Sequence, residues 1–489
     1  MASARERDAE ARDAVGTGSS LPPRNERLIH ASLQLIFDEM DCGLWPAGQP
    51  IVASRGAGNN VGNAFVFTPD LLASLLEVLP AKYFRPHLAK VRGHVAWLEE
   101  HVVSEVLPSG AKLNGWRSNH LPPEGGPLGW STAQAVRCIG RMHDLTRDLL
   151  VADVLSELGG TPGAAPDSSA WSRLLDSDLM ISDELPGADK TTAAAGSVGG
   201  GGGSTLKEII EARMSYPLSA LSASDPLGRR AGTAASLEAA VSYSAILFGP
   251  PGTAKTTVVS AIAKRLGWGF VTVDTSTFLQ DGMGNVASRI SYVFDRLLAL
   301  DKVVVLFDEI EEFALDRSNP SLTMESRLLT TAMLTKLADL RGLRKVAFFI
   351  ATNRLTALDA AVIRPGRFDL QLFVGTPNLA ARMARFCAKL DGLLPPLSEE
   401  LTADAVAAFE SLLTRRWESD VMFLTFLETE RLAADAAAVV GPWVGNSSSS
   451  TRESLELAFE RLLDAQATTM TVRGTVRDDF LVSRVMSRI

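Results

Sequence analysis

Apolar residues recur at spacings of three and four from residue 25 to about residue 160, which predicts amphipathic helices. The clearest stretches are ERLIHASLQLIFDEM and AKYFRPHLAKVRGHVAWLEEHVVSEVL. The Gly- and Pro-rich segment GWRSNHLPPEGGPLGW interrupts them, and a further helix is expected to begin near Ser131. We therefore predict an all-α N-terminal domain over residues 25–160.

From residue 206 the pattern changes to short apolar runs that alternate with helical segments. The runs SAILFG, GFVTVD, KVVVLFDE, KVAFFIATN and LQLFV are rich in β-branched and aromatic residues, as in strands that are buried on both faces. Gly267 fits the C-terminal cap of the first intervening helix. This alternation is typical of a parallel sheet covered by helices, so we predict an α/β domain over residues 206–377. Residues 378–489 have a helical pattern again.

Two segments differ in composition from these regions. Residues 1–24 are rich in charged and small residues, which predicts a disordered tail. Residues 161–205 contain TPGAAPDSSA and the run Gly199–Gly203, a composition that favours a flexible linker.

Charge and cysteine content narrow the functional classes. The net charge of −9 over 489 residues gives no general attraction to nucleic acid or to an anionic membrane, so neither is expected as a partner. No apolar run reaches the ~18 residues of a membrane span, and the first twenty residues lack the apolar core of a signal peptide. Cys42, Cys138 and Cys387 are too widely spaced to indicate disulfides or a zinc site, which favours a cytoplasmic location.

Three histidines recur every seven residues in the N-terminal region, at His87, His94 and His101. Seven helical residues span about 10.5 Å, which is too far for one metal ion to bind all three rings. The spacing therefore predicts a stripe of histidines on a helix surface. No H-E-x-x-H motif occurs, so no metalloprotease site is indicated.

The segment LFGPPGTAKTT, residues 247–257, follows the first predicted strand and precedes a predicted helix. It departs from the phosphate-loop pattern G-x-x-x-x-G-K-[ST] only at Ala254, where the pattern has glycine. If this position needs a positive φ, alanine costs about 1 kcal/mol, which a tight site tolerates. The alternative is an ordinary Gly-rich turn. The residues expected to bind nucleotide are Gly249, Pro250, Pro251, Gly252, Thr253, Ala254, Lys255, Thr256 and Thr257.

Each polar residue of the site has a predicted role. Lys255 would reach the β- and γ-phosphates, and Thr256 would hold Mg²⁺ through its hydroxyl. The strand VVVLFDE places Asp308 and Glu309 about fifty residues further on. Asp308 would support the Mg²⁺ shell, and Glu309 would polarise the attacking water.

A third motif connects these two to a known family. Residues 348–369, FFIATNRLTALDAAVIRPGRFD, closely resemble the second region of homology of AAA ATPases, T-N-x(4)-L-D-x-A-x(2)-R-P-G-R-F-D. The resemblance covers roughly residues 206 to 435. It implies an α/β P-loop nucleotide domain with a helical lid, hydrolysis of ATP with Mg²⁺, and a ring of subunits, usually a hexamer.

The resemblance also assigns roles within this motif. Asn353 matches the polar sensor that orients the water against the γ-phosphate. Arg364 and Arg367 match the arginines presented to the neighbouring subunit's nucleotide, with Arg364 as the primary finger and Arg367 in support. The alternative is that both arginines are structural and bond Asp359 or Asp369.

Two segments match the family less well. Ser419–Val421 resembles the [AS]-D-[LIV] helix start of the lid, but Trp417 and Glu418 replace the usual Thr-Gly. In the segment TFLQDGMGNVASRI, Phe278 matches the family's pore region, whereas Gly282 stands where members that thread polypeptide have an aromatic residue. Glycine cannot grip a chain by packing, and Met283 offers at most a soft apolar contact.

Two functions follow from these predictions. The first is an ATP-hydrolysing ring that remodels protein substrates or complexes recruited by the N-terminal domain. The second is a nucleotide-gated switch or scaffold that controls a partner effector, for example in defence or assembly, without threading. The complete set of hydrolytic residues favours the first function, and Gly282 favours the second.

Overall fold

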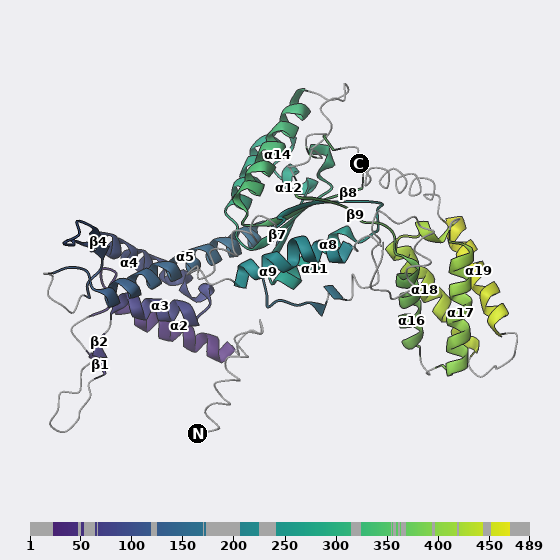
Figure 1. Ribbon diagram of the computed structural model, residues 1–489, viewed down its shortest axis with the longest axis horizontal. Helices are drawn as coiled ribbons and strands as arrows, with labels where there is room; N and C mark the ends of the chain where they lie inside the picture. Colours follow the sequence, from purple (N-terminus) through teal and green to yellow (C-terminus); the bar gives the residue numbers. More distant parts are fainter. Residues whose placement is uncertain are drawn as a thin grey trace, which may run out of the picture. The chain divides into compact units, whose positions relative to one another are not determined.

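The computed structural model describes residues 23–46, 50–52, 64–65, 67–118, 125–169, 171–172, 206–223, 241–313, 324–353, 355, 358–359, 362, 368–393, 397–417, 420–443 and 451–469. The chain divides into two compact units, residues 1–154 and 155–489 (Figure 1). The predicted tail lies outside the described residues except at its end, where the first helix begins at Pro23.

The first unit consists mainly of helices around one apolar core. Its elements are the helices α2 (Pro23–Asp38), α3 (Thr68–Val78), α4 (Leu88–Glu100) and α5 (Gly129–Glu157), the 3₁₀-helix η1 (Ala81–His87), and the strands β1 (Pro50–Val52), β2 (Ala64–Phe65), β3 (Val103–Val106) and β4 (Lys112–Gly115). Phe37 of α2, Phe84 of η1 and Cys138 of α5 are among its buried residues. The last turn of α5 extends beyond residue 154 into the second unit.

The sequence predicted an all-α first unit, and the structure differs from this prediction. The unit also contains two antiparallel strand pairs. β3 and β4 form a hairpin in which Val103 pairs with Gly115 and Val106 with Lys112. The sequence pattern predicted one helical stretch through this point, whereas α4 ends at Glu100. The β-branched pair Val102-Val103 favours an extended chain, and Gly110, with φ 80°, permits the turn.

The histidines of the first unit do not form a surface stripe. His87 and His94 are buried, and only His101 is exposed. The ring of His87 stacks on Phe37 at 4.5 Å, and Nδ1 of His94 lies 2.8 Å from the Gly43 carbonyl oxygen. Burial lowers the pKa of His94 to about 4, because the charged ring would be desolvated. The seven-residue spacing therefore places two of the three rings in the core.

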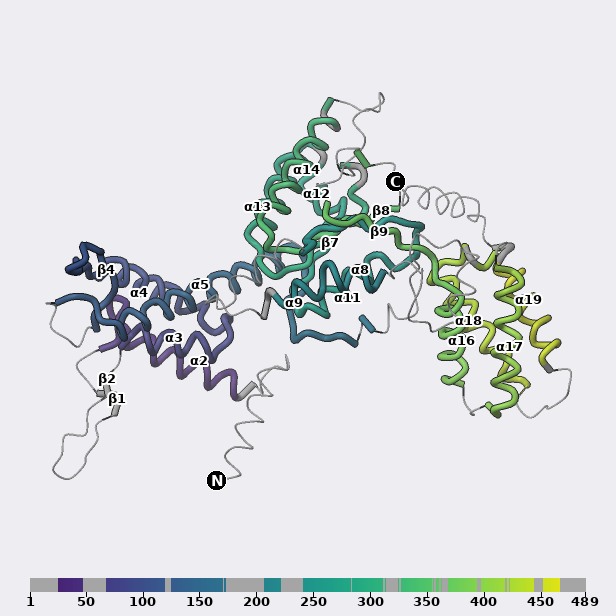
Figure 2. The backbone as a smooth tube through the Cα atoms, in the orientation of Figure 1, coloured from purple at the N-terminus to yellow at the C-terminus, as the bar shows by residue number. Residues whose placement is uncertain are grey.

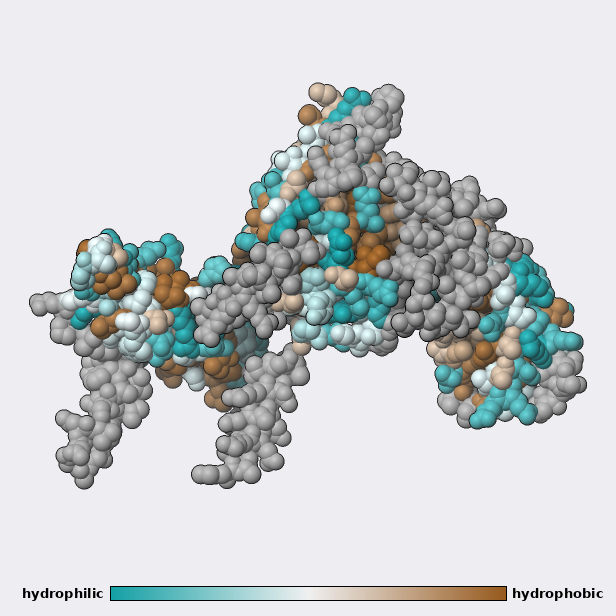
Figure 3. Space-filling view, viewed as in Figure 1, coloured by the Kyte–Doolittle hydropathy of each residue, from teal (hydrophilic) through white to brown (hydrophobic). Residues whose placement is uncertain are grey.

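Hydrophobic side chains also lie on the surface of the first unit, where the space-filling view shows several brown areas (Figure 3). Leu28 and Leu35 on α2, Val106 on β3, and Trp130 and Val136 on α5 are exposed.

The second unit is built around a five-stranded parallel sheet in the order β6-β7-β8-β5-β9. Its strands are β5 (Ser244–Phe248), β6 (Gly269–Asp274), β7 (Val303–Asp308), β8 (Ala347–Thr352) and β9 (Leu370–Phe373). All residues of β5 and β8 are buried, as the continuous apolar runs predicted. The chain leaves the centre of the sheet after β5 and returns to it at β8, so a crevice for ligands is expected at the carboxyl ends of these strands.

Helices cover both faces of this sheet, with α12 and α14 on one face and α8, α9 and α11 on the other (Figure 1). They are α8 (Leu206–Ile210), the π-helical turn η2 (Glu211–Ser215), α9 (Tyr216–Ala223), α11 (Lys255–Leu266), α12 (Thr275–Leu279), the 3₁₀-helices η3 (Met283–Asn285) and η4 (Ile310–Phe313), α13 (Val286–Leu298) and α14 (Met324–Leu343). Figure 2 shows α13 and α14 side by side.

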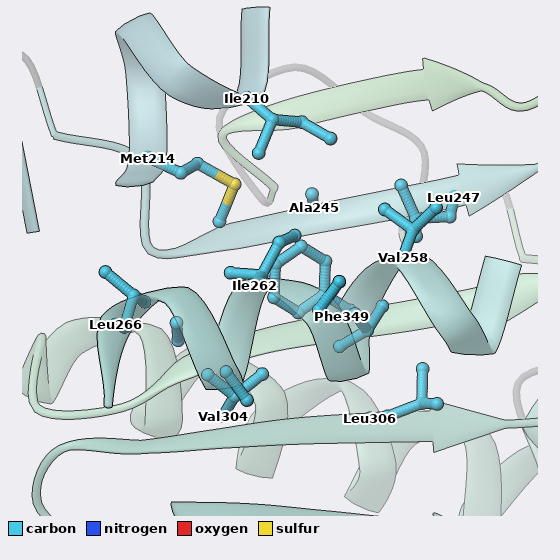
Figure 4. Packing of buried hydrophobic residues seen from close by; sticks show 14 of the residues in the cluster. Ile210, Met214, Ala245, Leu247, Val258, Ile262, Leu266, Val304, Leu306 and Phe349 are labelled. Carbon is cyan, nitrogen blue, oxygen red and sulfur yellow. The ribbon is translucent and has the colours of Figure 1, made fainter. Parts of the chain in front are cut away.

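The helix that follows the glycine loop is anchored to the sheet by its apolar face. Figure 4 shows Val258 and Ile262 of α11 beside the sheet residues Leu247 and Phe349. All four side chains are fully buried, and each one contributes about 2 kcal/mol from the apolar surface removed from water. α11 ends at Leu266, and the left-handed φ of 68° at Gly267 forms the predicted cap.

The first residues of the predicted linker are part of the second unit, so a flexible linker over residues 161–205 is wrong at its start. Thr161 pairs with Phe270 of β6 through two backbone hydrogen bonds of 2.7 and 2.9 Å. Trp171 is fully buried, and its indole N–H donates to Glu211 at 2.7 Å. The composition argument averaged over the whole segment and so missed the pairing at Thr161 and the burial of Trp171. Residues 173–205, with the run Gly199–Gly203, lie outside the described residues.

A helical lid follows the sheet. Its elements are α16 (Leu379–Asp391), α17 (Glu399–Arg415), η6 (Val421–Phe423), α18 (Phe426–Val440), η7 (Gly441–Trp443) and α19 (Thr451–Thr469). The rings of Phe386, Phe409 and Phe459 meet in its core and join α16, α17 and α19. Within the described residues, no helix has both the length and the apolar character needed to cross a bilayer.

Candidate functional site

The loop between β5 and α11 bends through backbone conformations that favour glycine. Gly249 and Gly252 have φ of 154° and 75°, and a Cβ on Gly249 would lie 2.1 Å from the Val374 carbonyl oxygen. Ala254 has φ 64°, so the position where the pattern has glycine is left-handed here too. The alanine is therefore strained by about 1 kcal/mol. Its carbonyl accepts the first hydrogen bond of α11, from Val258 N at 3.0 Å.

Lys255 is the first residue of α11, and its side chain is buried against the loop. Nζ donates to the carbonyls of Gly249 at 2.9 Å and Pro250 at 2.8 Å, and to Oδ1 of Asn353 at 2.7 Å. The Thr253 hydroxyl donates to the same Pro250 carbonyl at 2.9 Å. The structure thus brings the predicted phosphate-binding cation and the predicted sensor together. These acceptors are neutral, and an anionic phosphate oxygen is a stronger acceptor for an ammonium group.

The two predicted magnesium-binding residues also lie together. The Thr256 hydroxyl donates to Oδ2 of Asp308 at 3.1 Å. Asp308 is the last residue of β7 and aligns with Ala351 of β8 in the parallel register, so it lies at the same edge of the sheet as the loop. Hydroxyl and carboxylate oxygens are the donors that Mg²⁺ prefers, with water and phosphate oxygens completing its shell. The donor set therefore fits this ion.

Glu309 has an unusual backbone conformation for a non-glycine residue, with φ 54°. Its carbonyl accepts a hydrogen bond from the Thr275 hydroxyl at 2.7 Å, which fixes the peptide, and its side chain is exposed. Left-handed strain at a non-glycine residue is often found at functional sites. The turn at Glu309 directs the chain away from β7 directly after Asp308, at the edge of the sheet where the phosphate loop lies.

A third carboxylate at this edge, Asp274 at the end of β6, serves as a helix cap. Its Oδ1 accepts from the Thr277 backbone N–H at 2.9 Å and from the Ser276 hydroxyl at 2.7 Å. The Ser276 hydroxyl and the other hydrogen bonds to the ionised form hold the pKa of Asp274 below its usual value. These contacts explain Asp274 without a role in the site.

The lid contacts the loop at a point that the sequence motif did not predict. Ser419 lies outside the described residues, and Asp420 precedes only the short helix η6, so the lid helix does not begin at Ser419–Val421. α18 begins instead after Thr425, and its first N–H, from Phe426, donates to the Gly252 carbonyl at 3.2 Å.

Thr425 and Glu428 form a capping box at the start of α18. Glu428 N donates to the Thr425 hydroxyl at 3.4 Å, and Thr425 N donates to Oε2 of Glu428 at 2.7 Å. The T-x-x-E pattern before an apolar helical run is a known start signal, so the sequence did carry this information. Thr425 also lies against the loop, because a Cβ on Gly252 would be 3.3 Å from it.

The two predicted finger arginines, Arg364 and Arg367, lie outside the described residues. The residue two positions further on is firmly bound. Oδ2 of Asp369 accepts the backbone N–H groups of Tyr243 at 2.8 Å and Ser244 at 3.0 Å, and Oδ1 accepts from Arg341 at 2.7 Å. Asp369 therefore ties the chain after the finger segment to the start of β5 and the end of α14.

In the segment 277–290, which the sequence compared with a pore loop, the only aromatic residue lies in the core. Phe278 is fully buried and contacts the ring of Phe313, with the ring centroids 5.4 Å apart. Gly282 is exposed with φ 84° and precedes η3. The exposed position thus has no side chain that could grip a polypeptide.

Replacing Ala254 with glycine tests whether the strain at the loop matters. Ala254→Gly relieves the left-handed strain but increases the freedom of the loop before nucleotide binds. We expect the affinity for MgATP to stay the same or to rise by up to about fivefold, measured by calorimetry with a non-hydrolysable analogue. A large loss of affinity would show instead that the alanine methyl group makes a contact that binding requires.

Comparison with known proteins identifies the central part of the second unit. Residues 245–376 match the model of the ATPase family associated with various cellular activities (AAA). Over 164 residues the chain is 37% identical to the ATP-dependent zinc metalloprotease FtsH of Lachnoclostridium phytofermentans, a match that covers 33% of this chain and 28% of that protein. Over 162 residues it is 30% identical to the cell division cycle protein 48 homolog of Archaeoglobus fulgidus, covering 33% of this chain and 22% of that protein.

A solved structure also resembles the chain, at a level that carries no further conclusion. It is a chain of an E. coli HORMA:CdnC:Trip13 complex, with 22% identity and a TM-score of 0.39, covering 50% of this chain and 85% of that one. The matches to the curated relatives span about a quarter of their length, 28% and 24% for two of them. The family match, over residues 245–376, includes the phosphate loop, most of the sheet and the predicted sensor Asn353.

Proposed function

Because residues 245–376 form a domain of the AAA ATPase family, we propose that the protein is a ring ATPase that remodels protein substrates or complexes recruited by its N-terminal unit. The observation that carries the proposal is the cluster at the carboxyl edge of the sheet. There, Lys255 bonds the loop and Asn353, and Thr256 bonds Asp308. A cation, a polar sensor and a magnesium-binding pair, gathered at the carboxyl ends of the neighbouring strands β7, β8 and β5, are the groups that hydrolysis of a nucleoside triphosphate requires.

Each residue has one task in the proposed reaction. Lys255 turns from the loop carbonyls to the β- and γ-phosphates, and the N–H groups of the loop surround the phosphates. Thr256 and Asp308 would hold Mg²⁺, which would supply positive charge to the phosphates. Glu309 accepts a proton from the attacking water, and Asn353 orients that water against the γ-phosphate.

The proposal includes a hexameric ring in which Arg364, supported by Arg367, completes the site of the neighbouring subunit. It also includes a cytoplasmic location, which is supported by the three free cysteines. In the proposed recruitment, the apolar side chains exposed on α2, β3 and α5 of the first unit would contact the partner.

A second function is favoured by one observation. The exposed Gly282 and the buried Phe278 leave the corresponding pore segment without an aromatic residue at its surface. A ring of this kind would act as a nucleotide-gated switch or scaffold that changes the state of a partner effector without threading it.

The ATPase rate with and without an unfolded protein distinguishes the two functions. A remodelling ATPase is expected to turn over several-fold faster in the presence of a permanently unfolded protein, because its substrate is engaged at the pore. A rate that does not change with the unfolded protein, but changes with a partner captured by residues 23–154, would support the switch instead. Absence of any magnesium-dependent ATPase activity in the full-length chain would contradict both.

A further inference from the structure

One buried cation in the lid takes no part in the proposed chemistry. Arg382, in the first turn of α16, is 1% exposed. Within the described residues no carboxylate forms an ion pair with it, and its Nε has no hydrogen-bond partner. Burial lowers its pKa to about 9, because the charged guanidinium is desolvated. A buried charge without an ion pair lowers the stability of the fold unless its hydrogen bonds offset the loss of hydration. The hydrogen bonds of Arg382 therefore indicate its role.

The two terminal nitrogens of Arg382 bond both sides of the turn that begins α18. One donates to the Leu424 carbonyl at 3.0 Å, and the other donates to the Thr429 hydroxyl. The guanidinium carbon lies 5.5 Å from the centre of the Trp417 ring. The planar fork of arginine holds two acceptors at a fixed separation, which a lysine ammonium cannot do. Arg382 therefore fixes the position of the turn between Leu424 and Thr429 within the lid.

This turn is the part of the lid that touches the phosphate loop. It contains Thr425, which is buried against Gly252, and Phe426, whose N–H donates to the Gly252 carbonyl. A phosphate loop binds its ligand through backbone N–H groups, so a lid contact to a carbonyl oxygen does not compete with the phosphates. The contact instead holds the loop at Gly252, where φ is 75°.

We infer that Arg382 is a positioning residue for nucleotide binding: by holding Leu424 and Thr429 it places the Phe426 N–H on the Gly252 carbonyl and so keeps the phosphate loop in its binding conformation. This inference rests on the proposed function, because it assumes that the loop binds nucleotide. Arg382 would thus affect the affinity for nucleotide through the turn and the loop, without touching the nucleotide itself.

Phe426 offers a way to remove the contact without removing the helix. It is the first residue of α18, a position where proline is well tolerated because its N–H has no acceptor within the helix. Thr425 before it has φ −67° and ψ 173°, the extended conformation that proline requires of its predecessor. Phe426→Pro therefore deletes the N–H that bonds Gly252. Phe426→Ala is the matched control, since it also removes the ring but keeps the N–H.

The test is a double-mutant cycle on the dissociation constant for ADP with Mg²⁺, measured by calorimetry on the full-length chain. Arg382→Lys is introduced into the Phe426→Ala and the Phe426→Pro backgrounds. We expect it to raise the dissociation constant about fivefold with Phe426→Ala, the effect of one net hydrogen bond. With Phe426→Pro we expect less than a twofold change, because the contact is already absent and the two effects are not additive.

Equal fold-changes in the two backgrounds would overturn the inference, because Arg382 would then act only on the stability of the lid. Urea unfolding of the same four proteins checks this, since a stability effect should be the same in both backgrounds. If Arg382→Lys does not fold, Thr429→Val replaces it in the cycle and removes one of the two acceptors. A wild-type protein that binds no nucleotide would overturn the proposed function and this inference together.

Discussion

Lys255→Ala is expected to abolish nucleotide binding. The ammonium group would make charge-assisted hydrogen bonds to two phosphates, and each contributes about 2 kcal/mol. Their loss raises the dissociation constant for MgATP by about 10³-fold. The measurement is calorimetric titration of a non-hydrolysable ATP analogue with Mg²⁺. Thermal unfolding without nucleotide serves as the control, because Lys255 also bonds Gly249 and Pro250 within the loop.

Glu309→Gln provides the matched comparison at the same edge of the sheet. Glutamine keeps the size of the side chain but cannot accept the proton from water, so kcat should fall by 10² to 10⁴, the usual contribution of a general base. Binding of MgATP should be retained, because no bond to the phosphates is removed. Equal loss of binding in the Lys255 and Glu309 variants would contradict the separate roles assigned to the two residues.

Arg364→Ala is expected to bind ATP almost normally and to hydrolyse it about 10³-fold more slowly, the effect of a missing arginine finger. The reason is that Arg364 stabilises charge that develops only in the transition state. In the proposed ring it acts on the neighbouring subunit's nucleotide. The specific activity of the wild-type protein should therefore rise with protein concentration and level off once rings form.

Mixing Arg364→Ala with Lys255→Ala shows whether the finger acts between subunits. Each variant lacks a different half of the composite site, so mixed rings contain some interfaces with both halves intact. Recovery of activity in the mixture is expected, measured as phosphate release against the two separate variants. A fully active Arg364→Ala monomer would show that the ring mechanism is wrong.

The sequence predicted the nucleotide domain closely because local and long-range signals agree there. The central strands β5, β7 and β8 are short apolar runs, and the helices α11 and α13 each bury an apolar set of side chains, so pattern and burial lead to the same assignment. The first unit was harder to predict. The stretch through Val103 has apolar spacings that fit a helix, and only its pairing with Gly115, twelve residues away, determines that it is a strand.

The site was predicted from motifs, and the prediction was incomplete where a motif matched only in part. Lys255, Thr256, Asp308 and Asn353 lie together because their motifs end neighbouring parallel strands or begin the next helix. The lid start was placed at Ser419–Val421 on a partial match. The contact with Gly252 is made by Phe426 and depends on how the lid packs against the loop. The motif at Ser419–Val421 does not include Phe426 and therefore did not predict this contact.

The docking of residues 161–172 changes how the two units are connected. The Gly-rich segment starts and ends within the second unit, which begins at residue 155. Trp171, before the glycine run, bonds Glu211, which follows it. A 45-residue Gly-rich tether would have a root-mean-square reach of about 37 Å, whereas the four residues from Glu157 to Thr161 extend at most about 14 Å. Under the proposed recruitment of a partner by the first unit, lengthening the glycine run should therefore leave the covalent connection between the two units unchanged.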